Sequence, residues 1–155
     1  MNQRKLIIEI LDYIDSNIYK KITIEELSRI FFYNKDYLMR LFKREIGLTI
    51  FEYINSKKIY LSLQSYKDSK YSILRIAINH GFKSQEYYSE VFKKIMGIKP
   101  CSYKKFTKVT NELSYETIYN ITDSLVKLKL LMNRVEEYKN SIPQETVKKL
   151  SLYKN

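Results

Sequence analysis

A helical motif that occurs twice restricts the fold of this chain more than any other feature of its sequence. Phe42-Lys43-Arg44-x-x-Gly47 recurs 50 residues later as Phe92-Lys93-Lys94-x-x-Gly97, and Thr23 to Tyr33 matches Ser72 to Phe82 at an offset of 49. Apolar matches alone arise between many amphipathic helices, but the shared ending of Phe, two basic residues and Gly favours a repeat. Each copy reads as a helix, a turn and a second helix. We therefore predict helix-turn-helix units at about 22–47 and 71–97.

Capping residues and apolar spacing predict where the helices lie. Apolar residues at helical spacing indicate a first helix at about 3–18. Thr23 and Glu26 have the spacing of a capping box and place a short helix at about 24–31. The sequence Phe31-Phe32-Tyr33 is then expected to form a turn whose aromatic side chains are apolar anchors. N-caps are expected at Asn34 and Ser84, and helix ends at Gly47 and Gly97.

The predicted fold class is all-α. Three Gly and two Pro in 155 residues leave few positions for the tight turns of a β protein. A long amphipathic segment at about 50–67, which would span about 27 Å as a helix, joins the two helix-turn-helix subdomains. We expect residues 1–107 to form this body and residues 108–155 to form a C-terminal helical extension.

The charge of the chain favours a polyanionic partner. Its net charge is +11, with 28 basic and 17 acidic side chains. Most of the excess lies in residues 1–107, where 20 Lys and Arg face 11 Asp and Glu. Nucleic acid and an anionic membrane surface both fit this charge. No stretch approaches the roughly 20 apolar residues that span a bilayer, and no signal peptide is recognisable, so a cytoplasmic protein is expected.

The sequence contains no pattern typical of catalysis. His80 is the only histidine and lies beside Gly81 without a spaced set of Cys, Asp or Glu, so we interpret it as a turn or surface residue. Cys101 is the only cysteine, which fits a reducing compartment. A Gly-rich phosphate loop and a nucleophile elbow are both missing. We expect no enzyme activity, no metal and no cofactor.

The second unit carries a string of spaced residues that resembles the AraC/XylS family of transcription activators. The string reads Ile76-Ala77, then Gly81-Phe82-x-Ser84-Gln85-x-Tyr87-Tyr88-Ser89, then Val91-Phe92-Lys93-Lys94-x-x-Gly97-x-x-Pro100-x-x-Tyr103-Lys104. The resemblance covers about residues 5–106. It implies an all-helical body in which one long helix sets two recognition helices into successive major-groove segments of double-stranded DNA.

The resemblance also implies which residues contact DNA. Arg40 is the sharpest candidate in the first unit, because its guanidinium can pair with guanine O6 and N7. A phosphate clamp or a partnership with Asp36 one turn away is the alternative for this residue. The base-reading candidates are Asp36, Met39, Arg40, Gln85, Glu86, Ser89 and Glu90, and the phosphate candidates are Lys35, Lys43, Lys57, Lys58, Lys83, Ser84, Lys93 and Lys94.

The sequence departs from the family pattern in three places, the second recognition helix, the linking helix and the first turn. Glu90 stands where family members usually present Arg, and a carboxylate is unfavourable near phosphates unless it accepts from cytosine or pairs with Lys93 or Lys94. The second unit then either reads bases or acts mainly as a backbone clamp. Ser62 and Ser65-Tyr66 replace a small Ala and a Leu pair in the linking helix, and Phe32 replaces a frequent Gly. These changes concern local packing.

The extension contains an apolar seam with coiled-coil spacing. Its residues follow a 3-4-3-4-3 pattern that Lys139 interrupts. The helix either folds back onto the body or serves as a seam for a homodimer or another protein, through about 118–138. The seam residues are Ile118, Ile121, Leu125, Leu128, Met132 and Val135.

The function expected from these features is sequence-specific DNA binding that regulates transcription, as an activator that works with RNA polymerase. The alternative is a protein-interaction module that modulates another transcription factor through its C-terminal helix and binds DNA weakly. Because the first helix begins beside Met1 and 49 residues follow Phe106, we expect regulation by abundance or by a protein partner and not by an effector-binding domain.

Overall fold

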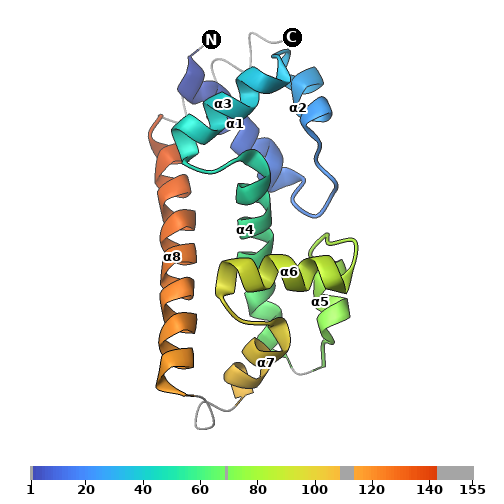
Figure 1. The fold of residues 1–155 in the computed structure, drawn as a ribbon. Coiled ribbons are helices and arrows are strands. Elements are labelled where there is room, and N and C mark those ends of the chain that lie inside the picture. The colour runs from blue at the N-terminus through green and yellow to red at the C-terminus, as the bar shows by residue number, and fades with distance from the viewer. Residues whose placement is uncertain (1, 69, 109–113, 143–155) are drawn as a thin grey trace.

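The computed structural model of the chain describes residues 2–68, 70–108 and 114–142. Every regular element in these residues is helical, which confirms the all-α class. Two small helical units lie one above the other along a central helix, and a long last helix runs beside both of them (Figure 1). The elements are α1 Gln3–Ser16, α2 Ile24–Phe31, α3 Lys35–Ile46, α4 Ile50–Ser62, the 3₁₀ helix η1 Leu63–Lys67, α5 Ile73–Asn79, α6 Gln85–Met96, α7 Pro100–Lys108 and α8 Tyr115–Asn140.

The helices begin at the predicted caps. Thr23 and Glu26 form the reciprocal capping box at the start of α2. Asn34 accepts from the backbone N–H of Asp36 at the start of α3, and Ser84 accepts from that of Tyr87 at the start of α6. These side chains satisfy backbone donors that a helix cannot pair internally. Both recognition helices end at a glycine in the left-handed region, with φ of 87° at Gly47 and 76° at Gly97.

Each unit has its own hydrophobic core. The first is built from α1, α2, α3 and the start of α4, and α1 supplies five side chains with no more than 1% exposure: Leu6, Ile7, Ile10, Leu11 and Ile14. The second is built from the end of α4, η1 and α5 to α7, and it is rich in rings, with Tyr66, Tyr88, Phe92 and Tyr103 in mutual contact. Each copy of the sequence repeat therefore contributes to its own hydrophobic core.

The departures in the linking helix compensate one another. Ser62 is fully buried, and its hydroxyl lies 2.9 Å from the Tyr88 hydroxyl, which in turn lies 2.8 Å from that of Tyr66. Ser62 Oγ also donates to the carbonyl of Ile59 at 2.7 Å. A serine that bonds back to its own helix competes with the regular pattern, and α4 changes to 3₁₀ geometry at this point. The segment predicted as one α-helix at 50–67 is thus α4 followed by η1.

The structure contradicts the prediction for Phe32 and confirms that His80 is a turn residue. Phe32 was expected as an apolar anchor, but its side chain is 91% exposed and its backbone has φ of 58°. This left-handed geometry explains why glycine is common at the position, and the ring avoids a clash by pointing into solvent. His80 lies at the end of α5 as expected, yet it is buried, with Nδ1 2.7 Å from the Ile76 carbonyl and its ring against Tyr19.

The C-terminal extension folds back along the whole body as α8 (Figure 1). Ile121 and Leu128 are buried in the core of the second unit, and Val135 is buried in the core of the first. The apolar seam thus contacts the chain itself, so in this conformation it is not open to a second copy or another protein. α8 begins at Tyr115 and ends at Asn140. Pro143 lies outside the described residues. None of the described helices is long and apolar enough to cross a membrane.

Candidate nucleic-acid interface

The second helix of each helix-turn-helix unit is partly free of the body. Figure 1 shows α3 and α6 crossing the molecule in similar directions, one in each unit, with α8 beside the end of each. α4 with 13 residues and η1 with 5 separate the units along the central axis. At about 1.5 Å and 2.0 Å per residue these elements span roughly 30 Å. Successive major-groove segments on one face of B-DNA recur about every 34 Å.

On α3 the three base-reading candidates are exposed together. Asp36, Met39 and Arg40 all lie outside the core, with Met39 39% exposed. The buried face of the same helix carries Leu38 and Phe42. Within the described residues Arg40 has no ion pair with Asp36, although the two lie one turn apart. The Arg40 guanidinium is therefore available to a ligand.

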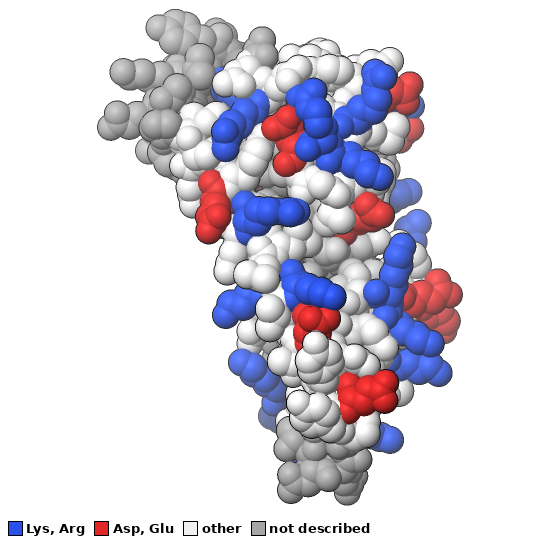
Figure 2. Space-filling model, turned by 60° about the vertical axis from the view of Figure 1, so that its left-hand side comes forward, with Lys and Arg blue, Asp and Glu red and all other residues white. Residues whose placement is uncertain are grey.

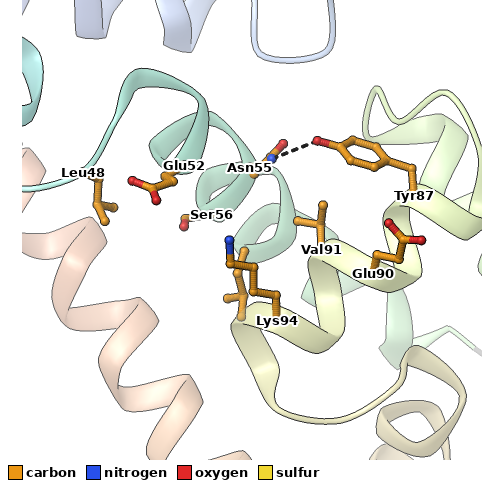
Figure 3. A pocket seen from close by; sticks show the side chains of 9 residues that line it. Leu48, Glu52, Asn55, Ser56, Tyr87, Glu90, Val91 and Lys94 are labelled. Carbon is orange, nitrogen blue, oxygen red and sulfur yellow. Dashed lines mark hydrogen bonds between the residues drawn. The ribbon is translucent and has the colours of Figure 1, made fainter. Parts of the chain in front are cut away.

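On α6 the reading surface is more acidic. Gln85, Glu86 and Glu90 are exposed, and Ser89 is half-buried between them. Glu90 is not ion-paired with Lys93 or Lys94 anywhere in the part of the chain that the structure describes. Figure 3 shows the Glu90 carboxylate and the Lys94 amine lying apart at the same pocket. The structure thus places an unpaired carboxylate on the surface that would face DNA.

The lysines predicted to contact phosphates fall into two groups. Lys43, Lys83, Lys93 and Lys94 are exposed on or beside the recognition helices. Lys35 is exposed as well but pairs with Glu25 at 2.8 Å, and the hydrogen bond from Lys35 lowers the pKa of the Glu25 carboxyl. Figure 2 shows basic side chains along the whole length of one face of the molecule, with acidic side chains between them. The face shown is therefore basic but of mixed charge.

Lys57 and Lys58 are engaged inside the protein. Lys57 forms an ion pair with Asp15 of α1. Lys58 is only 8% exposed, and its Nζ lies 3.3 Å from the Gly81 carbonyl and 5.6 Å from the centre of the Phe82 ring. Burial lowers the pKa of Lys58. Lys57 thus connects α4 to α1, and Lys58 connects α4 to the turn of the second unit. We therefore propose no phosphate contact for either lysine.

A pocket lies between the two units, next to α6. It is lined from α4 by Glu52, Asn55 and Ser56 and from α6 by Tyr87, Glu90 and Lys94, among others (Figure 3). Asn55 Nδ2 donates to the Tyr87 hydroxyl at 3.2 Å across this junction. Asn55 was not among the site residues predicted from the sequence, and Tyr87 was named only within the string that resembles the AraC/XylS family. A polar Asn that follows the apolar pair Tyr53 and Ile54 in the linking helix was the available signal.

A second contact between the units lies at the turn of the second one. Gly81 has φ of 80°, and a Cβ placed there would lie 2.8 Å from the carbonyl oxygen of Tyr19, in the loop between α1 and α2. Only glycine allows this approach at this backbone angle. Gly81 therefore forms the turn of the second unit and also provides its contact with Tyr19 of the first unit.

Known proteins share this arrangement. A family described as a helix-turn-helix domain matches residues 27–105. The multiple antibiotic resistance protein MarA of Salmonella typhimurium is 34% identical over 106 residues, 68% of this chain and 83% of MarA. The HTH-type transcriptional activator AarP of Providencia stuartii is 27% identical over 111 residues, 72% of this chain and 82% of AarP. The C-terminal domain of AraT, a response regulator from Geobacillus stearothermophilus, shares the fold with a TM-score of 0.62 at 22% identity, over 71% of this chain and 92% of that domain.

Proposed function

This chain belongs to the AraC/XylS family of helix-turn-helix DNA-binding transcription regulators, and from that premise we propose how it divides the work between its two units. The first unit reads the sequence of one major-groove segment through α3. The second unit holds the DNA backbone of the next segment through α6. The protein acts in the cytoplasm as an activator that works with RNA polymerase.

The free guanidinium of Arg40 is the observation that carries this proposal. Arg40 is exposed on the outer face of α3, and no ion pair to Asp36 holds it. An arginine in that state can form the bidentate pair with guanine that dominates specific contacts in the major groove. Asp36 and Met39 lie on the same exposed face and complete the reading surface.

The surface of α6 supports a holding role. Lys83 precedes α6, and Lys93 and Lys94 lie in its last turn, so cations flank the helix at both ends. Between them the unpaired Glu90 disfavours close approach to phosphates and offers no donor to a guanine. Cations attract the DNA backbone irrespective of sequence. We therefore expect Lys43, Lys83, Lys93 and Lys94 to contribute the salt-dependent part of the affinity.

The activator role is inferred from relatives. AarP is named as a transcriptional activator, and this chain aligns with most of its length. The alternative of a module that binds another transcription factor through its C-terminal seam loses its main support, because the seam residues Ile121, Leu128 and Val135 are buried against the body.

Selection from a random pool of duplexes tests the proposal. The full chain should enrich one sequence, and chemical protection of that duplex should cover two major-groove segments about one helical turn apart. Base changes in the first segment should weaken binding more than equal changes in the second. A pool that stays random, with binding that falls steeply with salt for every duplex, would contradict sequence-specific reading.

Glu90→Arg is expected to tighten binding without changing the preferred sequence. The substitution removes a negative charge beside the DNA backbone and adds a positive one, so one or two more phosphates are neutralised and the salt dependence steepens by about 1–2 in log–log slope. Titrations of the selected and the scrambled duplex over a range of salt concentrations measure both effects.

Glu116→Arg is the matched control for this substitution, because Glu116 is exposed on α8 and undergoes the same change of charge. It should leave the slope close to that of the parent chain. A change in the sequence that Glu90→Arg prefers would show instead that position 90 reads a base, and the holding role of α6 would be wrong.

A further inference from the structure

The C-terminal ends of both recognition helices lie against α8. Arg134 Nη2 donates to the carbonyl oxygen of Ile46, the last residue of α3, at 2.6 Å. At the end of α6, a Cβ placed on Gly97 would lie 3.9 Å from Ser124 Oγ. The last carbonyls of a helix lack partners within the helix, and a cation near them is favourable. Arg134 therefore completes α3 from a residue 88 positions away.

The apolar side of α8 contributes to both cores. Ile121 and Leu128, 0% and 4% exposed, belong to the core of the second unit, and Val135, 2% exposed, belongs to that of the first. Between them, Met132 packs against both cores. A single rigid helix thus buries side chains in each unit, so a rotation of one unit relative to the other must break apolar contacts.

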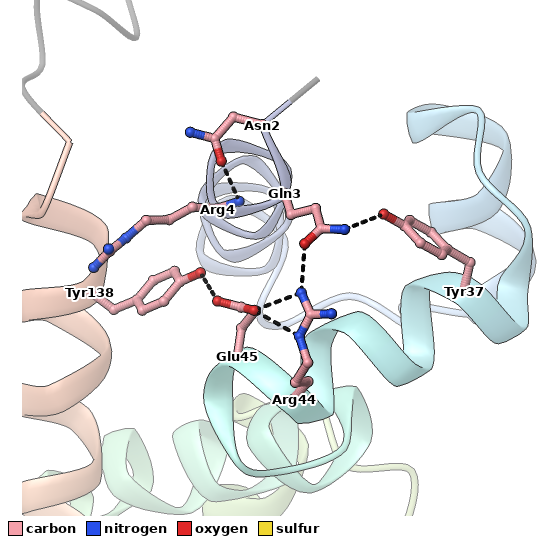
Figure 4. A network of polar contacts seen from close by, with 7 residues as sticks. All are labelled: Asn2, Gln3, Arg4, Tyr37, Arg44, Glu45 and Tyr138. Carbon is pink, nitrogen blue, oxygen red and sulfur yellow. Dashed lines mark hydrogen bonds and ion pairs between the residues drawn. The ribbon is translucent and has the colours of Figure 1, made fainter.

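Polar contacts fix α8 to the first unit. Lys139 pairs with Asp12 at 2.8 Å and with Asp15 at 2.7 Å, and Asp15 also pairs with Lys57 of α4. The side chains of Lys139 and Asp15 are 17% and 27% exposed, whereas that of Asp12 is 52% exposed, so the network is only partly shielded from water. The hydroxyl of Tyr138, the residue directly before Lys139, donates to Glu45 at 3.0 Å, and Glu45 also accepts from Arg44 (Figure 4).

The contacts of α8 and the contacts at the junction of the units lie on opposite sides of α4. Asn55 with Tyr87, and Tyr19 with Gly81, connect the units directly through the loop between α1 and α2 and through α4. Figure 1 places that loop on one side of α4 and α8 on the other. α4 alone would leave the units free to bend about it. Contacts on both sides remove this freedom.

We propose that α8 is a brace that fixes the position of α6 relative to α3 and so sets the spacing of the two major-groove segments that one chain contacts together. Arg134 and Lys139 are positioning residues in this device, because they act on DNA only through the recognition helices. The proposal rests on the proposed function insofar as both helices contact DNA. Fixing the helices before binding removes an ordering cost that a flexible pair would pay on the DNA.

The first experiment measures the brace without DNA. Spin labels are placed at exposed positions of the two units, Arg29→Cys in α2 and Lys105→Cys in α7, in a Cys101→Ser background of the full chain. Double electron–electron resonance spectroscopy should give one narrow distribution of distances between the two labels in this chain. Arg134→Met with Lys139→Met keeps the aliphatic stems but removes the hydrogen bond of Arg134 to Ile46 and the ion pairs of Lys139 with Asp12 and Asp15. The Tyr138 bond to Glu45 stays in place. We expect a clearly broader distribution in this variant.

A second measurement links the brace to DNA. If the arrangement that binds DNA falls to about a fifth of the molecules, the affinity for the selected duplex should fall about fivefold, because apparent affinity scales with the competent fraction. The same duplex should narrow the distribution again when it binds. The fraction of molecules in the arrangement that binds DNA and the affinity for the selected duplex should fall by the same factor. General destabilisation of the fold would not produce this agreement.

Lys127→Met with Lys129→Met is the matched control. Both lysines lie on the exposed side of α8, and Lys127 pairs only within the helix, with Asp123 at 2.8 Å. This control loses the same charge and should behave like the parent in both measurements. Circular dichroism checks that every variant is folded, and Arg134→Met alone serves if the double variant is not.

The outcomes separate the two proposals. A distribution that stays narrow in the folded Arg134 and Lys139 variants overturns the brace, whatever the DNA results are. A parent chain that prefers no duplex overturns sequence reading and leaves the spin-label result in place. A broad distribution in the parent chain would also contradict the brace.

Discussion

Arg40→Ala is expected to remove most of the preference of this chain for its target duplex. A bidentate arginine–guanine pair contributes about 1–3 kcal/mol of discrimination, which corresponds to roughly 5- to 150-fold in relative affinity. The loss should therefore appear mainly as weaker binding to the selected duplex, while a scrambled duplex loses only the effect of one charge. Competition titrations with the selected and scrambled duplexes at one fixed salt concentration measure the ratio.

Arg75→Ala provides the comparison, because Arg75 is exposed on α5 and carries the same charge outside both recognition helices. It should weaken binding to the selected and the scrambled duplex slightly and by the same factor. Arg40 would be a phosphate clamp, and the proposed reading surface of α3 wrong, if Arg40→Ala also weakened both duplexes by the same factor.

The largest loss of stability is expected for Gly81→Ala. A Cβ at this position would lie 2.8 Å from the carbonyl oxygen of Tyr19, and the residue has φ of 80°. Left-handed geometry costs a residue with a side chain about 1–2 kcal/mol, and relief of the close contact adds about 1–3 kcal/mol. The free energy of unfolding should fall by roughly 2–5 kcal/mol, and Tm by on the order of 10 °C.

Gly97→Ala separates the two causes. Its φ of 76° is similar, but the nearest atom to a Cβ there is Ser124 Oγ at 3.9 Å, an ordinary contact. This variant should lose only the conformational part, about 1–2 kcal/mol. Thermal and urea unfolding of both variants provide the comparison. Equal losses would mean that the contact between Tyr19 and Gly81 does not hold the units together.

The repeat and its caps were predictable because they depend on residues close together in sequence. Thr23 with Glu26, and Asn34 and Ser84 at their helix starts, act within one turn, so their spacing alone indicates the structure. The two cores follow from apolar spacing in the same way. Asp36, Met39 and Arg40 were placed by the family pattern, and the structure confirms only that they are exposed.

Contacts between distant segments were not predictable from the sequence. Lys139 looked like an interruption of the seam, yet it continues the side of α8 that faces the body because Asp12 and Asp15 from α1 meet it there. Lys58 was likewise predicted to contact DNA, because nothing local to it indicates that the turn at Gly81 will cover it. In both cases the partner lies in another element.

The chain of hydroxyl groups from Ser62 through Tyr88 to Tyr66 couples the effects of substitutions at these three positions. Each hydroxyl is buried and bonded to the next. An exchange of Ser62 for alanine would fit the available volume but leave Tyr88 and Tyr66 with two O–H groups and a single bond between them. One buried donor would then lack an acceptor, which costs about 1–3 kcal/mol. A change at Ser62 is therefore expected to cost less when Tyr88 loses its hydroxyl as well. The contact couples position 62 to position 88, which lies on a different helix and in a different part of the sequence.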